Sequence, residues 1–262
     1  MTPTTDPDRW QQVLAYPFRD PKWGNKLLVG SAVLLAGFIV PVVPGLFVMG
    51  YFARLLRQVI VDGEWRLPEW DDWGQMLTDG LKLFAVSLVY SLPAIVLMVI
   101  AFGLSFLPTF MPFFQAGVDE SQIGTWVAAM LGASMLGWVL MGLATLVWLV
   151  TLLFQPPAIA HMVAKGPFGA AFRIREWWRI VRRNWAGFAL AYVIAMGLVM
   201  AVYTAMTAMY FTLVLCFLMP FVMVPLEVYV LMIAGAVFGD AYRTGANRLA
   251  GVGLSPVEPE HG

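Results

Sequence analysis

The sequence is poor in charge, in histidine and in cysteine. Only 12% of its 262 residues are charged and 60% are hydrophobic, whereas a soluble domain carries about 25% charged residues. Too few polar side chains remain to cover the apolar surface, which excludes a soluble globular protein and predicts that lipid covers much of the chain. The single cysteine, Cys216, excludes an intramolecular disulfide.

Sequence motifs for catalysis are also missing. The only histidines are His161 and His261, and the sequence has no Gly-x-Ser-x-Gly motif, no Walker A motif and no paired cysteines. Glu64, Glu69 and Asp72 offer oxygen ligands for a hard cation such as magnesium, but a solvated helix face explains them better. We therefore predict a protein that is not an enzyme, with no cofactor, no metal and no nucleic-acid partner.

Long apolar runs predict membrane-spanning helices, each of which needs roughly 20 residues. Residues 83–107 and 125–154 contain no charged side chain, and residues 186–226 are long enough for two crossings joined by a turn near 204–208. These runs predict four spans. The first apolar block, residues 27–53, is interrupted by Pro41, Pro44 and Gly45, so it is one kinked helix, two short helices or a re-entrant pair.

Basic residues indicate which ends of these helices face the cytoplasm, because cytoplasmic flanks are enriched in Lys and Arg. Segment 161–185 holds six basic residues, whereas segment 108–124 holds only Asp119 and Glu120. The N-terminal segment is also basic, so the first block is expected to enter and leave on the same face. We predict an all-α integral membrane bundle in the plasma membrane, with both termini cytoplasmic. It is expected to have about six transmembrane helices in one domain, residues 1–254, with hairpins near 27–60, 83–154 and 186–238 and a disordered tail at 255–262.

A polar segment that carries tryptophan precedes each hairpin. From Pro68 onward the apolar residues recur at helical spacing opposite several carboxylates, which predicts an amphipathic helix at the membrane interface. Residues 174–185 repeat the pattern with arginines, which predicts attraction to anionic lipid headgroups. We expect the acidic helix around Asp71, Asp72 and Asp79 to dock on the basic one around Arg179, Arg182 and Arg183. The candidate functional residues in these segments are Glu69, Asp72, Asp79, Arg179 and Arg182, and the predicted interfacial anchors are Trp23, Trp70, Trp73, Trp177, Trp178 and Trp185.

Glu227 is the one ionisable residue well inside an apolar stretch. Charged residues within a bilayer are rare and often functional, which makes Glu227 a further candidate, although it could instead pair with Arg54 or Arg57. The function we predict is that of an accessory or scaffold protein that binds a membrane partner, as a subunit of a larger complex, or anionic lipid in the bilayer. The alternative is a small permease or channel-like transporter with Glu227 in its pathway.

Several motifs carry a family resemblance. The stretch PVVPG-x4-GY-x2-RLLR from Pro41 to Arg57, the segment LPEWDDWGQMLTDGLK and the segment AAFRIREWWRIVRRNW resemble an uncharacterised family of prokaryotic polytopic membrane proteins. The pattern of a basic, Trp-bearing helix followed by a hairpin is also distantly similar to the membrane domain attached to some glycerophosphodiesterases. The resemblance implies a multi-pass membrane protein and implies no reaction.

Overall fold

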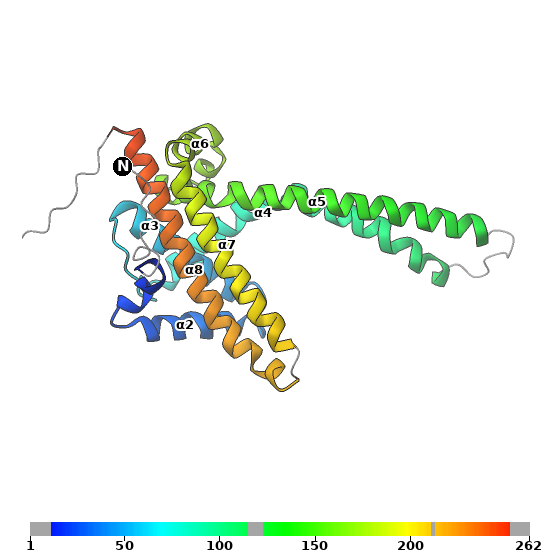
Figure 1. Cartoon of the computed structure of the whole chain (residues 1–262), viewed down its shortest axis with the longest axis horizontal. Helices are drawn as coiled ribbons and strands as arrows, with labels where there is room; N and C mark the ends of the chain where they lie inside the picture. Colours follow the sequence, from blue (N-terminus) through cyan, green and yellow to red (C-terminus); the bar gives the residue numbers. More distant parts are fainter. Residues whose placement is uncertain (1–11, 115–122, 211–212, 252–262) are drawn as a thin grey trace, which may run out of the picture. The chain divides into compact units, whose positions relative to one another are not determined.

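The computed structural model describes residues 12–114, 123–210 and 213–251 (Figure 1). Within these ranges the regular structure is helical throughout, without any β-strand. The elements in chain order are η1 (Tyr16–Arg19), α2 (Trp23–Ala36), α3 (Val43–Val61), α4 (Trp73–Phe114), α5 (Ile123–Lys165), η3 (Phe168–Phe172), α6 (Ile174–Arg183), α7 (Trp185–Tyr210) and α8 (Leu213–Leu249). The predicted tail at 255–262 lies outside the described residues.

Five helices are long and apolar enough to cross a membrane: α3, the first 36 residues of α4, α5, α7 and the Phe217–Leu249 part of α8. The prediction of an all-helical, multi-pass membrane protein is confirmed at this level. Helix α2 has only 14 residues and is too short to count as a span. Helix α7 continues through residues 204–208 to Tyr210, so the turn predicted there was wrong; the local sequence has neither Gly nor Pro to end a helix.

The chain divides into two compact units, one formed by Met1–Ala85 with Pro157–Gly262 and the other by Val86–Pro156. In the second unit α4 and α5 run antiparallel. The hydroxyl of Thr151 donates to the Tyr90 carbonyl at 3.2 Å, and the hydroxyl of Ser134 donates to the Ser105 carbonyl at 3.3 Å. A Cβ on Gly137 would lie 2.8 Å from the Ala101 carbonyl oxygen, so the small residue there permits close helix packing.

In the first unit, α8 is the central helix and packs against α2, α3, α6 and α7; Figure 1 shows α7 running beside it. Half of the apolar window of α3 and half of that of α8 is buried inside the protein, against 17% in α4, α5 and α7. About half of the apolar window of α3 therefore serves protein packing, with Leu55 and Val59 lying against Gly235 and Gly239 of α8.

Helices α3 and α4 cross with their backbones in contact. A Cβ on Gly50 would lie 2.7 Å from the Cα of Met76, and a Cβ on Gly80 would lie 2.8 Å from the carbonyl carbon of Leu46. Real Cβ atoms do not approach so closely, so each helix presents a glycine to the backbone of the other. This crossing positions the segment between the two helices, residues 62–72.

Candidate functional site

Residues 67–72 form an irregular connection and do not begin the predicted amphipathic helix. Helix α4 begins only at Trp73, and the Asp72 carboxylate accepts a hydrogen bond from the Gln75 backbone N–H at 3.2 Å. Asp72 also has a positive φ of 45°, a conformation that Asp tolerates better than most residues. A short polar side chain that caps a helix end favours a break at this position, so the helix predicted from Pro68 was wrong over its first turn.

The carboxylates of this segment are bound by α2 and α3. The Arg54 guanidinium donates to the carbonyl oxygens of Glu69 at 3.1 Å and Asp71 at 3.0 Å and pairs with the Asp71 carboxylate. The Lys26 ammonium lies 3.2 Å from the Glu69 carboxylate. Asp72 lies 4.0 Å from Arg54. The predicted docking of these acidic residues on α6 was wrong, because basic residues closer in the fold bind them.

Lys26 and Trp70 fix the segment in place from the other side. Lys26 is 5% exposed and donates to the Leu67 carbonyl at 2.6 Å and to the Asp20 carboxylate at 2.8 Å. The indole N–H of Trp70 donates to the Lys26 carbonyl at 2.9 Å, and its ring stacks on Tyr51 with centroids 4.2 Å apart. Trp70 therefore works as a packing residue of the first unit, unlike Trp23 and Trp73, which are exposed as expected of interfacial anchors.

Burial and hydrogen bonding act in opposite directions on Asp20. Burial alone would raise the pKa of its carboxyl group, but the hydrogen bonds from the Lys26 ammonium and the Lys22 backbone N–H outweigh it, so the pKa of Asp20 is lowered. The ionised carboxylate is thus the form that holds Lys26 in the folded chain.

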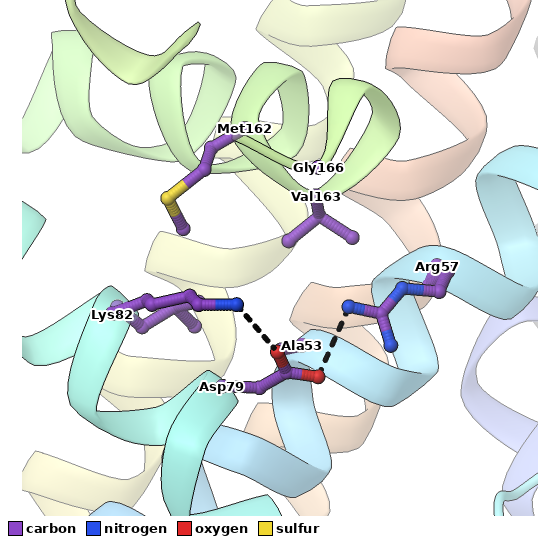
Figure 2. A pocket seen from close by; sticks show the side chains of 8 residues that line it. Ala53, Arg57, Asp79, Lys82, Met162, Val163 and Gly166 are labelled. Atoms are coloured by element: carbon purple, nitrogen blue, oxygen red, sulfur yellow. Dashed lines mark hydrogen bonds and ion pairs between the residues drawn. The ribbon is translucent and has the colours of Figure 1, made fainter. Parts of the chain in front are cut away.

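Asp79 lies in a second ion-pair cluster, shown in Figure 2. Its carboxylate is 3.0 Å from the Arg57 guanidinium and 3.7 Å from the Lys82 ammonium, and the residue is only 7% exposed. Met162 and Val163 cover it and leave a cavity of about 10 Å³, room for a single water molecule. Asp79 was predicted on a solvated helix face, and this was wrong because Arg57, 22 residues away, draws it into the helix crossing.

Helix α6 presents two different faces. Trp177 and Ile180 are buried, and the indole N–H of Trp177 donates to the Ala171 carbonyl at 3.1 Å. The prediction of Trp177 as an interfacial anchor was therefore wrong, because core packing takes the side chain away from the surface. Trp178 and Trp185, the latter at the start of α7, are exposed, and their role as interfacial anchors stays a prediction.

The outer face of α6 carries a cluster of arginines, here called the arginine face and formed by Arg175, Trp178, Arg179 and Arg182. These four side chains line a shallow hollow of about 430 Å³. None of the three arginines forms an ion pair with a carboxylate in the part of the chain that the structure describes. Five arginines and one glutamate occupy residues 173–183, and that glutamate, Glu176, lies 3.6 Å from Arg173. The arrangement leaves a concentrated positive charge beside an exposed indole ring.

His161 ties α6 to the core through a contact that the sequence did not predict. Its imidazole is 1% exposed; one ring nitrogen, Nδ1, lies 2.7 Å from the Tyr242 hydroxyl and the other, Nε2, 3.2 Å from the Glu176 carboxylate. His161 lies on α5, Tyr242 on α8 and Glu176 on α6. Since Tyr242 and Glu176 are 81 and 15 residues away from His161, no local spacing indicates the cluster.

Glu227 lies exposed on the surface of α8, beside the buried Val228. Its predicted partners, Arg54 and Arg57, are bound to Asp71 and Asp79 instead. The hydroxyl of the nearby Tyr229 donates to the Leu14 carbonyl at 2.8 Å, so this part of α8 meets the polar N-terminal segment. Neither of the two hollows described above reaches Glu227.

No group of three or more His, Cys, Asp or Glu side chains among the described residues is arranged to hold a metal ion.

A model of a protein family of unknown function, DUF4013, matches residues 33–211. The chain belongs to the DUF4013 family. No curated protein and no solved structure matches the chain.

The DUF4013 match contains most of the residues that build the site. It includes the α3–α4 crossing at Gly50 and Gly80, the segment 67–72 and the whole of α6, whereas α8 and Lys26 lie outside it. The family assignment confirms the predicted membership of an uncharacterised family. The more distant likeness to glycerophosphodiesterase membrane domains stays a prediction.

Proposed function

We propose that this DUF4013 protein is a non-enzymatic accessory protein of the membrane that binds anionic lipid headgroups through the arginine face of α6. The observation that carries the proposal is the absence of carboxylate partners around Arg175, Arg179 and Arg182 in the described structure. By contrast, Lys26, Arg54 and Arg57 each have a carboxylate within 4 Å. The unpaired arginines are therefore free to bind an external anion.

Phosphate is the anion whose geometry suits this face. A guanidinium group binds phosphate oxygens through two parallel N–H donors, and each basic residue close to an anionic membrane contributes about 1 kcal/mol. The exposed indoles of Trp178 and Trp185 suit the level of the headgroups, where tryptophan is enriched. Lipid phosphate thus matches both the charge and the aromatic side chains.

The core holds the arginine face in a fixed orientation. Trp177 is fully buried on the opposite side of α6, and the Glu176 carboxylate contacts the buried His161. A binding face that is already ordered loses little conformational entropy when a ligand binds. By the distribution of Lys and Arg in the sequence, we place this face on the cytoplasmic side of the plasma membrane.

Lipid titration of the purified full-length protein tests the proposal. We expect short-chain phosphatidylglycerol, but not phosphatidylcholine, to bind in native mass spectrometry and to raise the temperature of unfolding. Arg179→Gln combined with Arg182→Gln removes two of these contacts, so it should weaken binding by about 30-fold. Arg66→Gln is the matched control, because Arg66 is exposed and lies 3.8 Å from Glu64.

Equal binding by the control and the double variant would refute the proposal. A stoichiometric partner polypeptide that is retained by the wild type and lost from the double variant would instead make α6 a protein interface of a larger complex. The alternative of a permease requires a water-accessible route to Glu227, and protection of Glu227 from solvent on both sides of the membrane would exclude it.

A further inference from the structure

The connection between α2 and α3 exposes an apolar tip, residues 37–42, of sequence GFIVPV. Phe38, Ile39, Val40 and Val42 are all exposed, Ile39 to 85%. A loop in water normally carries polar side chains, because its backbone and surface are solvated. This tip has none, which indicates an apolar environment.

The backbone of the tip bonds within itself. The N–H groups of Phe38 and Ile39 donate to the carbonyls of Leu35 and Ala36 at 3.0 Å, and that of Val40 donates to Ala36 at 2.9 Å. Pro41 has no N–H group to satisfy. A non-helical turn lies at membrane depth more readily when its polar groups find partners without water, and these bonds supply partners for the N–H groups of Phe38, Ile39 and Val40.

The bases of the two helices lie on the same side of the membrane. Lys26, at the start of α2, donates to the Leu67 carbonyl, and Arg54, on α3, donates to the Glu69 carbonyl. Both helices are thus bound to one short segment, so the chain leaves on the side from which it enters. A single crossing by α3 is inconsistent with these contacts, which leaves either two complete crossings or none.

The lengths of the two apolar arms decide between these alternatives. Ten residues separate Lys26 from the tip, 27–36, and eleven separate the tip from Arg54, 43–53. At 1.5 Å per residue the arms are about 15 and 16 Å long, about half of the roughly 30 Å hydrocarbon core.

We infer that α2 and α3 form a re-entrant hairpin whose tip contacts the acyl chains of a single leaflet. The hairpin enters from the face that carries residues 62–72 and ends near the middle of the bilayer. Complete crossings are then made by α4, α5, α7 and α8. This surface recognises lipid hydrocarbon and is separate from the arginine face, which recognises headgroups.

Thiol labelling of the full chain tests the inference. All variants carry Cys216→Ser, so that each has a single thiol. Ile39→Cys places the thiol at the tip, and Val61→Cys places it at the exposed polar end of α3. Phe38→Cys gives a second tip position in case Ile39→Cys folds poorly. Right-side-out and inside-out vesicles are treated with a membrane-impermeant maleimide. We expect Val61→Cys to react from one face only, and the tip thiols to react at least about tenfold more slowly from either face, because thiolate does not form in hydrocarbon. After denaturation in SDS all three should react fully.

Spin labels at the same positions measure depth. The tip labels should lie near the bilayer centre, as accessible to oxygen as a label on Met135→Cys, which is exposed in the apolar part of α5. Labelling of the tip from the face opposite Val61 would show two complete crossings, and labelling from the same face would show a tip in water. Dipolar broadening between tip labels would show that a second copy of the chain covers the tip. Any of these three results overturns the inference.

Discussion

Replacing Gly50 by alanine tests whether α3 and α4 touch through their backbones. The new Cβ would lie 2.7 Å from the Cα of Met76, where ordinary contact is 3.4–4 Å. Both groups are held by helical backbone, so no side chain can rotate to relieve the clash. Because the Met76 carbonyl oxygen lies closer still than its Cα, the helices must separate by more than about 1 Å. Overpacking of this kind costs about 3 kcal/mol, while the better helix propensity of alanine returns about 1 kcal/mol. The net loss of stability is therefore about 2 kcal/mol.

Thermal unfolding of the purified protein in detergent, followed by circular dichroism, measures this loss. For a chain of this size about 2 kcal/mol corresponds to a Tm lower by roughly 4–8 °C. Gly80→Ala should behave in the same way, because its Cβ would lie 2.8 Å from the Leu46 carbonyl carbon. Gly45→Ala is the control in the same helix as Gly50: no atom lies within 4 Å of its added Cβ, so its Tm should stay the same or rise. If Gly50→Ala and Gly45→Ala unfold at the same temperature, the backbone contact is refuted.

Three other predictions concern single side chains. Trp177→Ala should lower the free energy of unfolding by about 3–5 kcal/mol because it empties a fully buried site. Trp178→Ala should change the free energy of unfolding by less than about 0.5 kcal/mol and weaken lipid binding. Equal unfolding curves for the two variants would contradict the assigned faces of α6. Asp79→Asn should lower the free energy of unfolding by about 1–3 kcal/mol. The loss is smaller than for a fully buried ion pair because Arg57 and Lys82 are partly exposed. A double-mutant cycle with Arg57→Gln should show coupling between the two residues, not additivity. Folding lowers the pKa of Asp20, so its ion pair with Lys26 should stabilise the protein fully at a pH above the pKa of Asp20 in the unfolded chain, about 3.9. This stabilisation should be lost as the pH falls through the lower pKa of the folded chain. In Asp20→Asn, stability should therefore depend less on pH in this acidic range.

The sequence predicted the membrane helices well, because apolar composition over 20 or more residues is a local property. The runs at 83–107 and 125–154 lie within α4 and α5. The start of α4 was misplaced because Trp70 and Trp73 have helical spacing although only Trp73 is in the helix. Trp70 is positioned instead by Tyr51 and Lys26, which lie too far away in sequence to be recognised by periodicity.

The candidate site was predicted only in part, for the same reason. Helical spacing indicated an arginine-rich helix over residues 174–185, of which α6 covers Ile174–Arg183. The predicted apolar face contained both Trp177 and Trp178, and spacing alone could not show which ring would be buried. That choice depends on Ala171 and on the packing of α6 against α8. The burial of Asp79 depends likewise on Arg57, and the His161 cluster on Tyr242.

A role in stabilising the helix explains only some of the arginines of α6. Cations near the C-terminus of a helix interact favourably with its dipole, which suits Arg182 and Arg183 in the last turn. Arg175 lies in the first turn of α6, where the dipole disfavours a cation, and Arg179 lies between the two ends. Since arginine cannot lose its proton, these side chains repel one another in the folded chain, and high salt should stabilise α6 in detergent by screening them. Folding alone therefore leaves this face uncompensated, and in the proposed function an anionic membrane surface would provide the charge that removes the repulsion.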